Sequence, residues 1–180
     1  KHLRLLANSY HSLAETGHIR LVIDIPEDEL VHWTDRDKIE KVTANLISNA
    51  LKYTPEHGVV TCRIRVLSGA PFTDENPGLR ILVADTGSGI PEKEKSRVFE
   101  RFYRTEKMRT QVSGGTGVGL SVARDLLDLM HGEIILKSIE GYGSVFVVTV
   151  PLGKDHLKES EYILSEAEQD VRIDTDTFLL

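Results

Sequence analysis

The stretch DKIEKVTANLISNALKYTP, from Asp37 to Pro55, decides the fold. Its pattern predicts a helix, because four apolar residues recur at helical spacing and form one stripe, namely Ile39, Val42, Leu46 and Ala50. Asp35 or Asp37 can cap its start. Pro55 ends it, since the residue before a proline is driven out of helical space. We therefore expect one face of this helix to be buried.

Three polar side chains lie beside that apolar stripe and project from the helix together. Asn45, Asn49 and Lys52 fall within roughly 60° of one another around the helix axis. Asparagine is a poor helix former, because its carboxamide competes for backbone hydrogen bonds. Two asparagines one turn apart suggest a functional use, although solvated polar groups on an amphipathic helix would give the same pattern.

Composition is ordinary for a globular protein, with 180 residues, 40% hydrophobic and 28% charged. The net charge of −6 argues against a general nucleic-acid binder but is compatible with a local pocket for an anion. Cys62 is the only cysteine, which excludes a disulfide framework and a cysteine-based metal site. No apolar run approaches 18 residues, so no membrane span is predicted. Because the chain begins at Lys1 without an initiator methionine, we expect it to be part of a longer protein.

The rest of the pattern predicts an α/β two-layer sandwich, because consecutive strands and separate helices do not follow a βαβ alternation. Helices are expected at residues 3–15, 92–99 and 118–130, and strands at 19–25, 59–67, 79–84, 133–139 and 144–150, with a further short strand possible at 31–34. The inward residues of the 118–130 helix are expected to be Val122, Leu126, Leu129 and Met130. Residues 153–180 are acidic and read as a linker or tail with a weak helical pattern at 156–168.

A first glycine cluster, DTGSGIP at 85–91, directly follows a predicted strand. The Asp85 carboxylate could accept hydrogen bonds from a buried amino group. Gly87 and Gly89 would let the backbone approach a flat ligand closely. A glycine turn with a local Asp–backbone hydrogen bond explains the same residues equally well.

A second cluster, GGTGVGL at 114–120, opens the 118–130 helix. Free N–H groups at a helix N-terminus bind phosphate. The cluster is neither a P-loop, which needs GK[ST], nor a dinucleotide fingerprint, because Leu120 occupies the place of the third glycine. The loop 104–119, which contains most of this cluster, is of a length typical of a functional lid or of a disordered segment. A third cluster, Gly141 to Ser144, reads as a hairpin turn. The seven histidines show no ligand spacing.

Together these motifs resemble those of sensor histidine kinases. NLISNALKYTP at 45–55 resembles the N box, DTGSGIP the G1 box, VFERFYR at 98–104 the F box, and GGTGVGLSVARDLL at 114–127 the G2 box. GYGSVFVVTVPL at 141–152 resembles the closing turn and strand. The resemblance covers residues 3–152 and implies the Bergerat ATP-binding fold. That fold is a mixed, mostly antiparallel sheet of about five strands, covered on one face by about three helices. We expect residues 1–152 to form this domain.

The resemblance also implies roles around an ATP molecule and a Mg²⁺ ion. Asn49 would coordinate Mg²⁺, and Asn45 would face the phosphates or a metal-bound water. Lys52 would supply a cation, Tyr53 would border the nucleotide, and Arg104 would reach the phosphates. Asn45, Asn49, Lys52 and Arg104 form the expected catalytic set.

Asp85 would accept from the adenine amino group. The remaining cofactor-binding residues implied by the resemblance are Gly87, Gly89 and Ile90 around the base, Phe99 and Phe102 packed at the base of the lid, and Gly115, Thr116, Gly117, Val118, Gly119 and Leu120 in the G2 box.

One position separates this chain from the ATP-hydrolysing members of the wider superfamily. Those carry a glutamate one turn before the metal-binding asparagine, where this chain has Asn45. The resemblance thus implies slow hydrolysis and transfer of the γ-phosphoryl group to a histidine. An ATPase or serine kinase of the same fold, or a non-catalytic module for nucleotide or protein contact, remains an alternative.

The expected acceptor is absent from this chain. The family's acceptor is a histidine followed by Glu or Asp, and His2, His11 and His18 do not fit. Expected partners are therefore a separate dimerisation and phosphoacceptor domain and a response regulator or receiver domain, with no nucleic acid and no direct membrane contact. We expect a monomeric domain on the cytoplasmic side. Residues 153–180 fit a linker to a further domain, as in a hybrid kinase.

Overall fold

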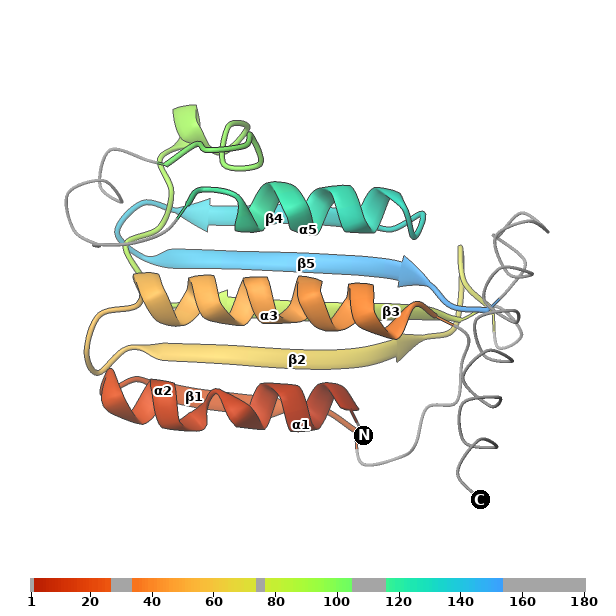
Figure 1. Ribbon diagram of the computed structural model, residues 1–180, viewed down its shortest axis with the longest axis horizontal. Coiled ribbons are helices and arrows are strands. Elements are labelled where there is room, and N and C mark those ends of the chain that lie inside the picture. Colours follow the sequence, from red (N-terminus) through yellow and green to blue (C-terminus); the bar gives the residue numbers. More distant parts are fainter. Residues whose placement is uncertain (1, 27–33, 74–76, 105–115, 154–180) are drawn as a thin grey trace, which may run out of the picture.

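Helices cover one face of a five-stranded sheet in the computed structural model (Figure 1). The structure describes residues 2–26, 34–73, 77–104 and 116–153. Helix α3 (Arg36–Tyr53) lies over the middle of the sheet, with α1 (His2–Ser9) and α2 (His11–Thr16) to one side and α5 (Gly119–Asp128) to the other. The predicted α/β two-layer sandwich is confirmed.

Helix α3 begins and ends where the sequence predicts. The Asp35 carboxylate accepts a hydrogen bond from the Lys38 backbone N–H at 3.0 Å, so Asp35 rather than Asp37 is the N-cap. At the other end Thr54 is extended, as expected before proline, and its hydroxyl donates to the Ala50 carbonyl at 2.7 Å. The four residues of the predicted apolar stripe are at most 4% exposed.

The five strands follow the predicted segments closely. They are β1 (Arg20–Asp24), β2 (Val59–Leu67), β3 (Gly78–Asp85), β4 (Glu133–Ile139) and β5 (Gly143–Pro151). The spatial order is β1-β2-β3-β5-β4, in which β1 and β2 are parallel and the other three pairs antiparallel. The sheet is therefore mixed and mostly antiparallel, as the resemblance implies.

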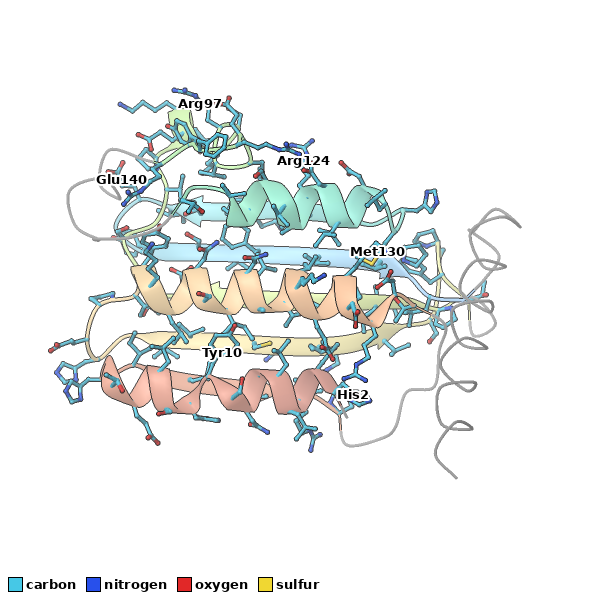
Figure 2. All side chains as sticks on the ribbon, in the orientation of Figure 1. His2, Tyr10, Arg97, Arg124, Met130 and Glu140 are labelled. Carbon is cyan, nitrogen blue, oxygen red and sulfur yellow. The ribbon has the colours of Figure 1, made fainter. Side chains whose placement is uncertain are left out.

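The predicted helix at 3–15 is wrong in one respect, because the chain turns at Tyr10 and forms two helices. The Tyr10 N–H donates to the Ala7 carbonyl three residues back, and its hydroxyl donates to the Ala44 carbonyl of α3 at 3.4 Å. Tyr10, labelled in Figure 2, thus faces α3. Ala7 and Ala14 are buried while Leu13 is 53% exposed, since small side chains let these helices lie close to their neighbours.

The inward face of α5 agrees with the prediction in part. Met130 is buried and Leu126 packs partly buried against the core, as predicted, but Leu129 is 65% exposed, and Ala123 and Leu127 are buried instead. The series Val122, Leu126, Leu129 and the series Ala123, Leu127, Met130 both have spacings of four and three residues, so the helical period alone does not distinguish them. The helix predicted at 92–99 is reduced to a single 3₁₀ turn, η1 (Glu92–Glu94).

Two predicted features fall outside the described residues. These are most of the short strand at 31–34 and the helical pattern at 156–168. Among the helices that the structure describes, none is both long enough and apolar enough to cross a membrane.

Candidate functional site

An open pocket of about 220 Å³ lies between α3 and the start of α5. The two helices contact each other along the helical face of the sheet, and the chain before α5 closes one side. The pocket is lined by Asn45, Ser48, Asn49, Lys52, Tyr53, Val98, Tyr103, Arg104, Thr116, Gly117, Gly119 and Leu120.

Helix α3 supplies the polar wall of this pocket. Asn45, Ser48, Asn49 and Lys52 are spaced three, one and three residues apart, which places all four on one strip of the helix. The apolar stripe beside them is buried and fixes the rotation of the helix. Neither carboxamide makes a side-chain hydrogen bond within the described part of the chain. Both are therefore available to a ligand.

The start of α5 supplies the opposite wall. Its N-cap residue, Val118, has no side-chain acceptor, so the first backbone N–H groups of the helix receive no side-chain cap. A Cβ added to Gly119 would lie 3.0 Å from the Asn45 Oδ1 atom. Glycine at this position therefore lets the uncapped helix end approach the carboxamide closely. Such an end attracts an anion through its N–H groups and its dipole.

Two cations converge on the same space. Burial lowers the pKa of Lys52, and the positive charge of Arg104 lowers it further. Burial raises the pKa of the neighbouring Tyr53, and Arg104 partly opposes that rise. The Lys52 ammonium also lies 5.4 Å from the centre of the Tyr53 ring. Because Lys52 and Arg104 repel each other here, an anion between them would be stabilised by both.

Asp85 lies beside the pocket without lining it. Its Oδ1 atom accepts a hydrogen bond from the Gly87 N–H at 2.8 Å. Burial raises the pKa of this carboxyl, while the backbone N–H groups of Gly87 and Ser144 oppose the rise. A Cβ on Gly87 would be 2.4 Å from the Tyr53 carbonyl oxygen, so the Asp85 loop packs directly against the end of α3.

The glycines after Asp85 pack closely against the protein's own backbone. Gly89 has a φ of +62°, and a Cβ there would lie 2.0 Å from the Ile139 carbonyl oxygen. From the third cluster, the Gly141 N–H donates to the Ser88 carbonyl at 2.8 Å. Thus two glycine clusters far apart in sequence pack together. Ile90 is buried beside them and only 4% exposed.

The two phenylalanines of the F-box segment behave differently. Phe99 packs edge-to-face on Phe146 at 6.5 Å, and the Arg124 guanidinium lies 5.7 Å from its ring centre (Figure 2 labels Arg124). Phe102 is 74% exposed, so the expectation that it packs is wrong in this structure. Its φ of +65° and the hydrogen bond from its N–H to the Gly117 carbonyl hold the backbone so that the ring points outward.

Nine of the predicted site residues line the pocket, namely Asn45, Asn49, Lys52, Tyr53, Arg104, Thr116, Gly117, Gly119 and Leu120. Seven others do not: Asp85, Gly87, Gly89, Ile90, Phe99, Phe102 and Val118. Gly115 lies outside the described residues.

Sequence reasoning missed three lining residues, Ser48, Val98 and Tyr103. Ser48 lies on the same strip of α3 as Asn45 and Lys52, so the helical period could have identified it. Val98 and Tyr103 follow a 3₁₀ turn and irregular backbone, whose direction no period predicts. Arg97 lies 4.3 Å from the Tyr103 ring centre and covers it.

A Gly119→Ala variant tests whether the close approach of α3 and α5 matters. The added methyl group would displace the Asn45 carboxamide, and we expect anion or nucleotide affinity to fall about tenfold, the equivalent of about 1.4 kcal/mol. Thermal stability should change little, because alanine favours a helix more than glycine does. Isothermal titration measures the affinity, with Asp125→Ala on the exposed side of α5 as the control. Unchanged affinity in Gly119→Ala would show that the Asn45 carboxamide does not contact the ligand.

Comparison with known proteins places this chain in a family. Residues 34–154 match the model of the histidine kinase-, DNA gyrase B-, and HSP90-like ATPases. The sensor histidine kinase WalK of Bacillus subtilis is 43% identical over 139 residues, which are 77% of this chain and 22% of WalK. The chain therefore spans about a fifth of that relative.

Solved structures agree with the match. The catalytic domain of the histidine kinase ThkA is 26% identical with a TM-score of 0.66, covering 83% of this chain and 90% of that one. Full-length ShkA, solved in complex with AMPPNP, is 25% identical with a TM-score of 0.69, covering 84% of this chain and 29% of that one. The chain belongs to the family of histidine kinase-, DNA gyrase B- and HSP90-like ATPases, which confirms the resemblance of its boxes to those of sensor histidine kinases.

Proposed function

We propose that this chain binds ATP with Mg²⁺ and transfers the γ-phosphoryl group to a histidine on a separate phosphoacceptor domain, in two-component signalling. One observation carries the proposal. Two carboxamides, two cations and an uncapped helix end converge on one open pocket. The family is named for ATPases, which must bind ATP, and the structure of ShkA in complex with AMPPNP supports binding of a nucleoside triphosphate.

The residues of the pocket fit a metal–triphosphate group. An amide oxygen is a hard ligand of the kind that Mg²⁺ accepts alongside phosphate oxygens and water. Asn49 would hold the ion, and Asn45, one turn earlier, would bind a phosphate or a metal-bound water. When bound, Mg²⁺ neutralises charge on the phosphates. Lys52 and Arg104 would balance the rest of that charge.

The base would lie toward Asp85. A carboxylate beside the end of α3 can accept a hydrogen bond from the adenine amino group. Because Asp85 is partly buried, water competes less for this hydrogen bond than it would at the surface. Gly87 and Gly89, with Ile90 beside them, would shape the pocket for the base. The G2-box residues Gly115, Gly117 and Gly119 would present backbone N–H groups to the phosphates, with Thr116 and Val118 between them in the cofactor-binding segment.

Slow hydrolysis is part of the proposal. Among the described residues that line the pocket, none is Asp, Glu or His, so the lining offers no carboxylate or imidazole to take a proton from an attacking water. Asn45 occupies the place where a carboxylate would do so. This observation disfavours an ATPase of the same fold. Phosphoryl transfer depends mainly on positioning and charge stabilisation, which this pocket can supply to an incoming histidine.

The wider assignments are also proposals. Residues 1–152 would form the ATP-binding domain and 153–180 a linker or tail. The parent protein would supply the dimerisation and phosphoacceptor helices, and a response regulator or receiver domain would take the phosphoryl group onward. The domain would act on the cytoplasmic side of a membrane-anchored sensor.

Titration with a fluorescent ATP analogue, with and without Mg²⁺, tests the binding. We expect saturable binding that Mg²⁺ strengthens and that Lys52→Ala weakens about tenfold, or about 1.4 kcal/mol. Lys41→Ala, on the exposed side of the same helix, is the matched control and should bind like the parent. No binding at millimolar nucleotide would favour a protein-contact module instead.

Steady-state hydrolysis tests the second part. The chain alone should turn over ATP far more slowly than the roughly 10 s⁻¹ typical of enzymes. Turnover near that rate, measured by phosphate release, would favour an ATPase.

A further inference from the structure

The face of the sheet opposite the helices carries an apolar row. Side chains alternate along each strand, so the partners of the buried residues point outward. In register across this face, Leu82 of β3 pairs with Val147 of β5, which pairs with Ile135 of β4. Ile135 is 45% exposed, and Val22 of β1 is 37% exposed on the same face. None of the described helices covers this open face (Figure 1).

The open face is positively charged, although the whole chain is acidic. By alternation and register it carries five cationic residues against two acidic ones, a surplus of three positive charges: Arg20, Arg63, Arg65, Arg80 and Lys137 against Asp24 and Glu133.

Not all of these cations are satisfied by neighbours. Asp24 accepts from both Arg63 and Arg65 at 2.6 Å. Arg80 lies directly opposite Arg65 in the ladder, an arrangement of like charges that costs free energy. Within the described residues, no ion pair involves Arg80 or Lys137. The open face therefore favours an acidic partner with apolar residues.

The segment 154–180 of this same chain has that chemistry. It contains eight acidic and three basic residues, a surplus of five negative charges, which leaves the preceding 153 residues with a net charge of −1 out of the total of −6. At helical spacing, small and apolar residues form a stripe: Leu157, Ser160, Leu164, Ala167 and Val171. Acidic residues fill five of the ten remaining positions between Leu157 and Val171.

The point where this segment leaves the sheet is beside Arg80, one of the two unpaired cations. The Leu152 N–H donates to the Pro77 carbonyl at 2.8 Å, which ties the end of β5 to the start of β3. Arg80 pairs with Thr149, two residues before the end of β5. Five strands about 4.8 Å apart make a sheet roughly 20 Å wide. A helix of 15 residues spans about 22 Å, so 27 residues suffice to cross it.

We propose that residues 154–180 pack across the open face of the sheet. The stripe would lie on the row of Leu82, Val147 and Ile135, and the acidic residues would lie against Arg80 and Lys137. This covers the exposed apolar row and relieves the repulsion between Arg65 and Arg80. The proposal stands independently of the proposed function, because the pocket lies on the other side of the sheet.

A nitroxide on the full 180-residue chain tests the proposal. Ser165→Cys provides the attachment site, because Cys62 is buried and burial raises the pKa of its thiol to about 12, which keeps it unreactive. We expect paramagnetic broadening of the methyl signals of Leu82, Val147 and Ile135. The methyl signals of Leu5 and Leu13, exposed on the helical side, should remain sharp.

Charge reversal provides the matched comparison. Arg80→Glu should reduce the broadening at least twofold. Salt at about 0.5 M should do the same, because at this concentration surface charges are screened within a few ångströms. Lys41→Glu, the same charge reversal at an exposed position of α3, should leave the broadening unchanged. The methyl spectra report in the same experiment that each variant is folded.

Three outcomes would overturn the proposal. Sharp methyl signals on the open face would show that the segment does not bind there. Equal broadening on both faces would show unspecific contact. In the third, nitroxide-labelled chains are mixed with separate, isotope-labelled chains that carry no nitroxide. If the methyl signals were broadened as strongly in this mixture, the segment of a second copy would be the one that binds the open face.

Discussion

An Asp85→Asn variant is expected to bind ATP about 10- to 100-fold more weakly while unfolding at the same temperature as the parent or a higher one. A hydrogen bond to a charged group contributes about 1.5–3 kcal/mol, which corresponds to that loss. The asparagine oxygen can still accept from the Gly87 N–H, so the loop is retained. Its amide nitrogen would then face the adenine amino group, donor against donor.

The stability of the unliganded variant follows from the direction of the pKa shift. Burial holds the pKa of Asp85 above its ordinary value in the folded chain. A raised carboxyl pKa contributes stability that is complete below the unfolded pKa, about 4, and is lost as the pH rises through the folded value. At neutral pH the ionised carboxylate thus opposes folding, and asparagine removes that cost.

Thermal unfolding from pH 4 to pH 7, together with nucleotide titration, measures both effects. The melting temperature of Asp85→Asn relative to the parent should rise with pH across this range. Asp128→Asn, at an exposed position of α5, is the control and should change neither quantity. An Asp85→Asn chain that binds ATP normally would contradict the placement of adenine beside this carboxylate.

The second large effect is expected from Asn49→Ala, which should lose Mg²⁺-dependent binding. Removing a partner from the second shell of a metal site costs 10- to 100-fold in metal affinity, and removing a direct ligand should cost at least about 100-fold. The residual affinity should equal that of the parent measured without Mg²⁺. The fold should persist, because the side chain of Asn49 faces the pocket and forms no hydrogen bond within the described residues.

Asn45→Asp is the comparison that divides the two asparagines. It changes a residue on the same strip one turn away and should largely keep Mg²⁺-dependent binding. Titration of nucleotide at several Mg²⁺ concentrations separates metal affinity from nucleotide affinity. If Asn45→Asp lost the Mg²⁺ dependence and Asn49→Ala kept it, Asn45 rather than Asn49 would be the metal ligand, and the proposed assignment would be wrong.

Local rules predicted the elements of this fold well. The cap at Asp35, the stop at Pro55 and the alternation in the strands each depend on neighbouring residues, so their bounds could be read from the sequence. The inward face of α5 could not, because two registers of equal period compete and only contact with α3 decides between them. The turn at Tyr10 likewise depends on a contact with Ala44, 34 residues away.

The site shows the same division. The strip of Asn45, Asn49 and Lys52 follows from the helical period alone. The role of Gly89 does not, since the backbone that excludes a side chain there belongs to Ile139, far along the chain. Phe102 was misplaced because its positive φ is fixed by a hydrogen bond to Gly117 rather than by its own apolar character.

Phosphoryl transfer to an acceptor is the most direct measurement of the central claim. The chain would be incubated with γ-labelled ATP, Mg²⁺ and the purified dimerisation and phosphoacceptor helices of its parent protein, with Asn49→Ala in parallel. The account predicts label on the acceptor that is lost in acid and kept in base, as expected for phosphohistidine, and none with Asn49→Ala. Acid-stable label, or rapid phosphate release without labelled acceptor, would contradict it.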